Sequence, residues 1–245
     1  MNTHDWIIPD WPAPSWVKSA STTRAGGVSV GAYASLNLAG HVADDSQAVA
    51  ENRRRLRERL ELPAEPVWLA QVHGRGIVDA SVALPGAEGD GAVSRLPGHV
   101  CAVMTADCLP VLLCDRAGTC VAAAHAGWRG LADGVIEATV AAMQVPENSL
   151  IAWLGPAIGP QAFEVGAEVR AAFVAHDPAA AEAFQPHGER WHADLYRLAH
   201  QRLAALGITA VHGGGLCTHS DPARFYSYRR DGVTGRMATL IWMEG

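Results

Sequence analysis

Three short apolar runs between residues 100 and 125 constrain the fold more than any other feature of this chain. They are VCAVMTA, LPVLLC and CVAAAH, and the sequence DRAG, at residues 115–118, separates the last two. Short aliphatic runs bounded by turn residues are typical of β-strands. We therefore predict strands here, with an antiparallel hairpin formed by the second and third runs.

The rest of the chain alternates between helical and strand-like patterns. Helices are predicted over residues 46–60, 131–143, 165–176 and 195–206, and strands over residues 150–154, 208–212 and 238–243. Gly207 follows the last of these helices at a position where helix C-termini favour glycine. Helices and strands that alternate around a hairpin indicate a mixed-sheet α/β protein. Because the 245 residues contain no repeat, low-complexity tract or long linker, we expect a single domain over residues 1–245.

The composition excludes several classes of protein. Hydrophobic residues make up 49% of the chain and charged residues 18%, which is ordinary for a globular protein and excludes a disordered or collagen-like chain. The net charge of −6 argues against a general nucleic-acid or membrane-surface binder. No apolar run approaches the ~18–20 residues that cross a bilayer, and Asp5, Pro9 and Asp10 interrupt the region where a signal peptide is apolar. We expect a cytoplasmic protein with neither a nucleic-acid nor a membrane partner.

The predicted helix over residues 46–60 places one arginine on its apolar face. Arg53 lies on the same helical stripe as Val49 and Leu56, so its side chain should point inward. An inward-facing arginine needs an anionic partner. The periodicity alone favours the plainer alternatives, an arginine that reaches solvent or one that meets a structural carboxylate.

The predicted hairpin places a cysteine near a histidine. If the turn centres on Ala117, Cys108 lies nearly opposite His125, with Cβ atoms ~5 Å apart. That separation suits two ligands of one ion, or a thiolate and its base. The same register pairs Cys114 with Cys120, which we interpret as two buried, small apolar residues. The five cysteines include no C-x-x-C pair, and we expect reduced thiols.

His73, in the sequence LAQVHG at the end of an apolar segment over residues 67–72, is a third candidate. With Cys108 and His125 it would complete a Cys-His-His set, and three protein ligands with an open fourth position are the arrangement of a catalytic zinc. Taken singly, each of these residues is more often packed than ligating. The spacing alone does not place His73 beside the other two.

Two glycines follow His125 in the sequence AGWRG, at a strand-to-helix junction. Backbone N–H groups at such a junction suit a phosphate or carboxylate, which makes Gly127 and Arg129 candidate anion contacts. The sequence is neither a P-loop nor a dinucleotide-binding fingerprint. Further basic residues are predicted in loops: Arg24, Arg229 and Arg230. Two interpretations stay open for these loops: they close over a bound anion, or they are exposed to solvent and bind nothing.

A series of short motifs runs along nearly the whole chain. In order they are STTRAGGVS, YASLNLAGHVADD, ENR, QVHG, TADCLPVLL, AAHAGWRG, LGPAIG, FEVG and FYSYRRDGVTGR. The most specific combination is TADC followed by HAGWRG, with QVHG upstream. In this series the chain resembles the YfiH/YlmD-like family, also called the laccase-domain or multicopper polyphenol oxidase family.

The resemblance implies a four-layer α/β/β/α sandwich, shared at the level of fold with the deamidase domain of cytotoxic necrotising factors. It implies a zinc site at His73, Cys108 and His125, the same three residues that were candidates from the sequence. It further implies a purine nucleoside enzyme that performs phosphorolysis of adenosine, inosine, guanosine and methylthioadenosine, and that also deaminates adenosine. Small molecules, purine nucleosides and phosphate, would then be its partners.

The resemblance also suggests contacts for the substrate. Arg53 of the ENR motif and Asn37 of the YASLNLAGHVADD motif would contact phosphate or nucleoside. Asp90, in the sequence EGDGAVS, stands near the place of an acidic residue of the family, but we do not include it in the predicted site.

Alternative activities stay open. Cys108 and His125 can equally form the dyad of a metal-free cysteine hydrolase or amidase, and the family includes PgeF, an editing factor for peptidoglycan precursors. A His₂Cys set can also hold type 1 copper, as in a polyphenol oxidase, but the eleven histidines include no H-x-H pair for a trinuclear centre. Phenol oxidation would then come from copper in the zinc site. A structural zinc is disfavoured because three ligands, not four, are apparent.

Overall fold

The computed structural model describes residues 6–245, so the first five residues of the predicted domain, Asp5 among them, lie outside the described residues. The α-helices are α1 (Ser46–Arg59), α2 (Trp128–Asp133), α3 (Val135–Met143), α4 (Ala167–His176), α5 (Leu195–Ala205) and α6 (Tyr228–Asp231). The strands are β1 (Val17–Ser21), β2 (Ile77–Asp79), β3 (Gly91–Ser94), β4 (Val100–Thr105), β5 (Leu109–Asp115), β6 (Val121–Ala126), β7 (Leu150–Leu154), β8 (Glu164–Val165), β9 (Phe184–His187), β10 (Arg190–Ala193), β11 (Val211–Gly213) and β12 (Met237–Met243). No helix in this described range is both long and apolar enough to cross a membrane.

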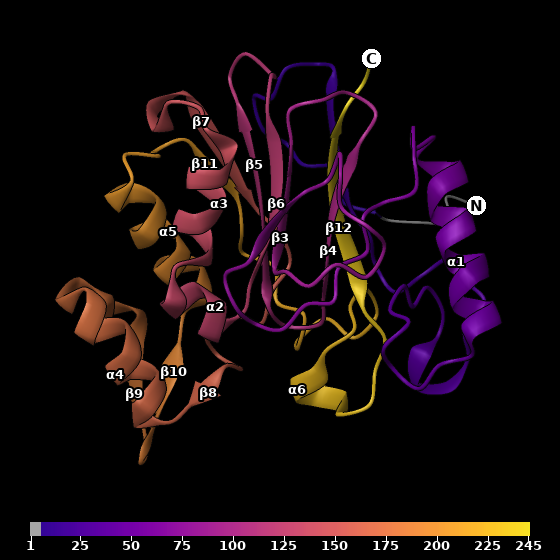
Figure 1. Cartoon of the computed structure of the whole chain (residues 1–245). Helices are drawn as coiled ribbons and strands as arrows, with labels where there is room; N and C mark the ends of the chain where they lie inside the picture. Colours follow the sequence, from indigo (N-terminus) through magenta and orange to yellow (C-terminus); the bar gives the residue numbers. More distant parts are fainter. Residues whose placement is uncertain (1–5) are drawn as a thin grey trace.

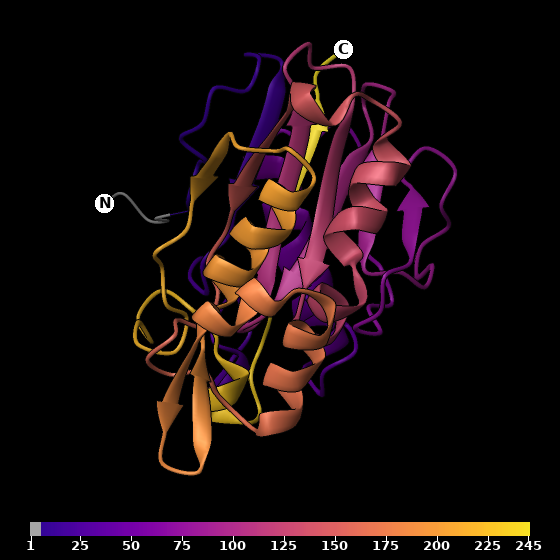
Figure 2. The same ribbon diagram turned by 90° about the vertical axis from the view of Figure 1, so that its left-hand side faces the viewer.

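These elements stack in four layers (Figure 1). A mixed six-stranded sheet, of order β11-β7-β5-β6-β3-β2, faces an antiparallel three-stranded sheet, of order β1-β12-β4. Helices α2, α3 and α5 cover the outer side of the larger sheet, and α1 covers that of the smaller one. A third, small sheet, β8-β10-β9, projects with α4 at the lower end of the molecule (Figure 2). The predicted mixed-sheet α/β fold with flanking helices is confirmed.

Alternating side chains along the central strands fill the spaces between the layers. In β5, Val111 and Leu113 pack toward the helices, whereas Leu112 and Cys114 pack between the two sheets. Because both faces of this strand are covered, all seven of its residues are buried. This explains why the sequence LPVLLC is an unbroken apolar run.

Helix α1 confirms the helix predicted over residues 46–60. Asp45 caps it by accepting a hydrogen bond from a backbone N–H of the first turn. Val49 and Leu56 are buried, as their spacing predicted. Asn52 is fully buried beside them, and its side-chain amide bonds the backbone of the loop over residues 28–37. The hydrogen bonds of the Asn52 side chain therefore hold the helix against this loop, in addition to apolar packing.

The β5–β6 hairpin is present, but its register differs from the prediction. Cys114 pairs with Val121 and does not lie opposite Cys120, and His125 pairs with Pro110, so Cys108 is not nearly opposite His125 as predicted. The turn is the reason: the backbone N–H of Asp115 donates to the Cys120 carbonyl, and the Asp115 carboxylate accepts two backbone N–H groups of the turn, which centres it just beyond Ala117. Cys114 and Cys120 therefore point to opposite faces of the sheet. All five cysteines are free, as predicted.

Three other boundaries differ from the prediction. The helix predicted over residues 131–143 is two helices, α2 and α3, because Gly134 adopts a left-handed φ of 93° between them. Helix α4 begins after residue 165, because that residue belongs to β8. The strand predicted over residues 208–212 is β11, which starts at Val211. The glycine expected after the last helix, Gly207, has a φ of 78°, as that position requires.

Candidate metal centre and cavity

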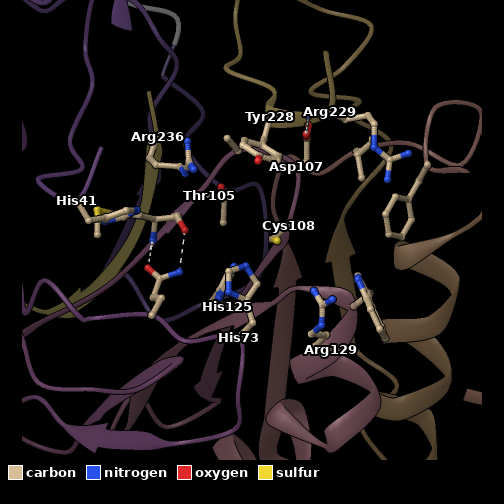
Figure 3. Close-up of a pocket in the computed structure, with 16 residues that line it drawn as sticks. His41, His73, Thr105, Asp107, Cys108, His125, Arg129, Tyr228, Arg229 and Arg236 are labelled. Atoms are coloured by element: carbon tan, nitrogen blue, oxygen red, sulfur yellow. Dashed lines mark hydrogen bonds between the residues drawn. The ribbon is translucent and has the colours of Figure 1, made fainter. Parts of the chain in front are cut away.

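The structure brings the three candidate ligands together at one end of the larger sheet (Figure 3). A ring nitrogen of His73, a ring nitrogen of His125 and the sulfur of Cys108 all lie within 4.8 Å of one another. The two imidazole rings meet edge to face, with centroids 4.9 Å apart. Three donor atoms this close can share one ion.

Each ligand comes from a different local structure. His125 is the penultimate residue of β6 and is buried. Cys108 lies immediately before β5, after Asp107, whose φ is 93°. His73 lies in a loop and itself has a φ of 62°. Left-handed conformations are unfavourable for residues that carry a Cβ, and they cluster at functional sites.

Asp90, which the sequence prediction left out, orients two of the ligands. Its carboxylate accepts hydrogen bonds from Nδ1 of His125 at 2.8 Å and from the backbone N–H groups of His73 and Gly74 at 2.9 and 2.7 Å. The bond to Nδ1 leaves Nε2 of His125 for a metal. Burial raises the pKa of Asp90. The hydrogen bonds from His125 and Gly74 lower it by a larger amount, so the pKa lies below its ordinary value. The signal in the sequence, an Asp-Gly before a short apolar run, is too common to identify such a residue alone.

The glycines of the HAGWRG motif leave room around the ligands. A Cβ on Gly127 would lie 2.9 Å from Sγ of Cys108 and 3.3 Å from Cδ2 of His73. A Cβ on Gly130 would lie 2.6 Å from the carbonyl oxygen of Gly74, in the loop that carries His73. The structure thus places Gly127, predicted as an anion contact, directly against the cysteine ligand.

Half-buried Cys108 and buried His125 shift each other's pKa in opposite directions. Burial raises the pKa of the Cys108 thiol. The neighbouring His125 and His73 lower it by a larger amount, so the pKa is about 6. Burial lowers the pKa of His125. Cys108 and Asp90 raise it by a larger amount, so the pKa is about 9. In the metal-free protein both shifts favour a thiolate beside an imidazolium. The thiolate is the form of cysteine that binds metals, and metal binding would release the imidazolium proton.

The three ligands lie on the wall of a cavity of about 540 Å³. Cavities of this size hold small organic ligands. Trp128, Phe163 and Tyr228 supply aromatic wall. Gln71 of the QVHG motif also lines it and exchanges two hydrogen bonds with the backbone of Met104, which ties this loop to β4. The other lining residues are His41, Met104, Thr105, Ala106, Asp107, Arg129, Ile158, Arg229 and Arg236.

Two predicted arginines and one unpredicted arginine line this cavity. Arg129 and Arg229 lie to one side of the view in Figure 3, and Arg236 lies to the other. The backbone N–H of Arg229 donates to the Asp107 carboxylate at 2.6 Å. Arg236 is half-buried, and burial lowers its pKa. Its backbone N–H donates to Oδ1 of Asn37 at 2.9 Å, so Asn37, predicted as a substrate contact, is a buried group that holds Arg236 in place.

The remaining predicted contacts lie outside the cavity lining. Arg53 points inward, but its Nε donates to the Leu38 carbonyl at 2.9 Å and its guanidinium lies 4.3 Å above the Trp68 ring. It borders a separate pocket beside α1. The side chains of Arg24 and Arg230 each donate to several backbone carbonyls.

The family model described as multi-copper polyphenol oxidoreductase laccase matches residues 18–244. The chain belongs to this family. A Pseudomonas aeruginosa protein named purine nucleoside phosphorylase PA4543 is 59% identical to it over 98% of each chain. An Escherichia coli protein named purine nucleoside phosphorylase YfiH is 53% identical over 97% of this chain and 98% of its own length.

Solved structures of this laccase-like family share the fold. Neisseria meningitidis protein NMB0706 superimposes with a TM-score of 0.95 at 52% identity, covering 98% of this chain and 100% of its own. YlmD from Geobacillus stearothermophilus superimposes with a TM-score of 0.89 at 30% identity, covering 94% and 93%. The resemblance to YfiH/YlmD-like proteins is therefore confirmed.

The family description implies a metal, and the donor set of the cavity fits one. A thiolate and two imidazoles beside an open cavity suit zinc or copper. The bond between Asp90 and His125 is the carboxylate–histidine arrangement common at such centres. Across residues 6–245, one further group of three potential ligands lies close enough to share an ion, on the small sheet. Neither group is the histidine-paired trinuclear centre of a multicopper oxidase.

Proposed function

We propose that this protein is a zinc-dependent purine nucleoside phosphorylase. It converts adenosine, inosine, guanosine and methylthioadenosine, together with phosphate, into the free base and the ribose 1-phosphate, and it deaminates adenosine as a second activity. Two relatives carry the proposal, because proteins named purine nucleoside phosphorylase are 59% and 53% identical along nearly the whole chain. We further propose that it acts on these small molecules in the cytoplasm, as a single domain.

In this proposal His73, Cys108 and His125 hold the zinc. When bound, zinc supplies a Lewis acid that polarises an oxygen of the substrate or of water. Asp90 keeps His125 in the tautomer that offers Nε2, and it also fixes the loop of His73. Copper in the same ligand set accounts for any oxidation of phenols.

Phosphorolysis sets clear demands on the cavity. The bond between C1′ of the ribose and the purine nitrogen breaks, and a phosphate oxygen forms a new bond to C1′. The electron pair of the broken bond leaves with the purine, which takes up a proton. The phosphate must therefore be held, stripped of water and aimed at C1′, while the purine is held on the other side.

Arg236 is the cavity residue best suited to hold the phosphate. Within residues 6–245, the hydrogen bonds of its guanidinium all use Nη1, which donates to backbone carbonyls, so its other N–H groups can bind an anion. Arg129 and Arg229 add positive charge on the other side of the cavity. The role of Arg53 as a phosphate contact stays a prediction, and its position on α1, outside the cavity lining, makes it the natural comparison for Arg236.

The aromatic wall suits the purine. Trp128, Phe163 and Tyr228 offer flat, apolar faces on which a base can stack. Deamination of adenosine replaces the amino group at C6 by the oxygen of water and releases ammonia. The same cavity serves both reactions in this proposal, with phosphate or water as the attacking group.

Chromatography of adenosine incubated with the purified protein tests the proposal. With phosphate present we expect adenine, and without phosphate we expect none. Inosine as a product would report deamination. A Cys108→Ala variant, shown to be folded by circular dichroism, is the blank. If neither product exceeds the blank, the nucleoside proposal is wrong.

A metal-free cysteine hydrolase or amidase is the second candidate, favoured by the short approach of the Cys108 sulfur to the His125 ring. In this candidate Cys108 is the nucleophile, His125 the base and Asp90 the group that orients the base. Peptidoglycan precursors are one substrate class. Zinc content separates the two candidates: stoichiometric zinc that is lost in Cys108→Ala supports the phosphorylase, and a metal-free protein with amidase activity supports the hydrolase.

A further inference from the structure

The small sheet β8-β10-β9 places two histidines and a glutamate on one face. Glu164 of β8 pairs directly with His192 of β10. His187 of β9 pairs with Arg190, two residues before His192, which makes His187 the diagonal neighbour of His192 on the same face. The strand pairing itself therefore gathers the three side chains.

Their donor atoms are close enough to share an ion. A carboxylate oxygen of Glu164 and one ring nitrogen each of His187 and His192 lie within 4.8 Å of one another. The two rings stack with centroids 4.1 Å apart and 16° between their planes. Nε2 of His187 is 3.6 Å from Oε2 of Glu164. His187 is exposed and the other two are half-buried, so an ion has access from solvent.

We propose that Glu164, His187 and His192 form a second metal site, separate from the cavity, for a divalent ion of the late first transition row such as Zn²⁺. Two imidazoles and one carboxylate are the donors that these ions accept, with water in the remaining positions. Each zinc bond is ~2.0–2.2 Å long, so two ligands of one ion lie about 4 Å apart or less. The donor atoms, within 4.8 Å of one another, exceed this separation by less than 1 Å.

Arg190 is the competing partner of the glutamate. Its Nε is 3.6 Å from Oε1 of Glu164, whereas His187 approaches Oε2. Exposed ion pairs of this kind are weak, and the two contacts use different oxygens. Oε2 can therefore bind the ion while Arg190 stays on Oε1. Because the guanidinium repels a cation, its removal should tighten metal binding.

The proposed site adjoins the cavity through β8. Phe163, the residue before Glu164, lines the cavity, and the backbone carbonyl of Glu164 accepts a hydrogen bond from Nη1 of Arg229 at 2.8 Å. A metal bound to the small sheet therefore restrains β8, the strand that directly follows Phe163 of the cavity wall. Its role is structural, since no atom of the three ligands is part of the cavity lining.

Zinc titration against a chromophoric chelator tests the proposal in a Cys108→Ala background, which disables the first centre. A second substitution, His187→Ala or Glu164→Gln, should weaken zinc binding by more than the ~10–100-fold that loss of a supporting contact causes. His200→Ala, which removes an exposed histidine of α5, is the matched control and should leave the affinity unchanged. Arg190→Ala should raise the affinity.

Cobalt spectra and melting curves give independent measurements. Co²⁺ bound to Cys108→Ala should show ligand-field bands without the thiolate charge-transfer band, whereas the unmodified chain should show both. Zinc at a hundredfold excess over Kd should raise the Tm of Cys108→Ala by about 5 °C, and should not raise that of Cys108→Ala/His187→Ala. The proposal is wrong if Cys108→Ala binds no zinc, or if the His187 and Glu164 variants bind zinc as tightly as the His200 control.

Discussion

Replacing Asp90 by asparagine is the sharpest test of how the metal centre is built. One carboxylate oxygen accepts from Nδ1 of His125 and the N–H of His73, and the other accepts from the N–H groups of Gly74 and Val72. Asparagine offers one oxygen and one NH₂ group. With the NH₂ group toward Gly74 and Val72, both of their N–H groups lose the acceptor; with it toward His125 and His73, the N–H of His73 loses the acceptor and the His125 ring must change tautomer. Asp90 is fully buried. Each unsatisfied donor costs ~1–3 kcal/mol, which gives about 1–6 kcal/mol for one or two donors.

The same substitution should weaken the metal site. If the amide nitrogen faces His125, the imidazole takes the tautomer with its proton on Nε2, the atom that a metal needs. We expect Asp90→Asn to lose about 10–100-fold in zinc affinity, measured by chelator competition, and to unfold at lower urea concentration. Asp115→Asn is the matched control, because Asp115 is also buried and accepts backbone N–H groups, but in the β5–β6 turn. Equal zinc affinity in the two variants would refute the role assigned to Asp90.

Other substitutions and conditions give further expected results. Gly127→Ala should lower zinc affinity and leave the circular dichroism spectrum unchanged. The backbone at φ −64° and ψ 157° accepts alanine, so the strain falls on the contact between the new Cβ and Cys108. An unchanged zinc affinity would contradict the packing argument. In zinc-free protein, alkylation of Cys108 should reach half its maximal rate near pH 6 and not near pH 9. The pKa of His125 is raised to about 9 by the same pair, so its contribution to stability is lost as the pH rises from 6.5 to about 9, while that of Cys108 is gained from about 6 to 9. The two shifts therefore offset each other, and we expect the free energy of unfolding to change little between pH 6 and 9. Arg236→Ala should raise KM for phosphate at least about tenfold, the loss of one charge-assisted hydrogen bond, with a smaller change in KM for the nucleoside; if Arg53→Ala produces this effect and Arg236→Ala does not, the phosphate lies beside α1.

Most of the fold could be predicted because its signals are local. The unbroken apolar run of β5 and the stripe of Val49 and Leu56 on α1 each report burial directly. The hairpin register could not be predicted from the same pattern, because the Asp115 side chain, and not the apolar residues, sets the centre of the turn. The small sheet β8-β10-β9 was missed because its strands have two to four residues, several of them exposed.

The residues of the candidate site also fall into two groups, those that local spacing predicts and those that long-range contacts place. Cys108 and His125 are neighbours through one hairpin, so spacing alone suggested their proximity. The position of His73 depends on Asp90, and no periodicity links these two residues, although they are close in the fold. Arg236, the residue before β12, reaches the cavity and is held by Asn37, 199 residues earlier. Such long-range contacts leave no pattern in a single sequence.

The formation of ribose 1-phosphate from adenosine, followed by phosphorus NMR, tests most directly the claim that this cavity catalyses phosphorolysis. With phosphate present, the unmodified protein should produce ribose 1-phosphate and adenine in equal amounts, and the folded Cys108→Ala variant should produce neither. Adenine released without ribose 1-phosphate, or equal rates for the two proteins, would contradict the account.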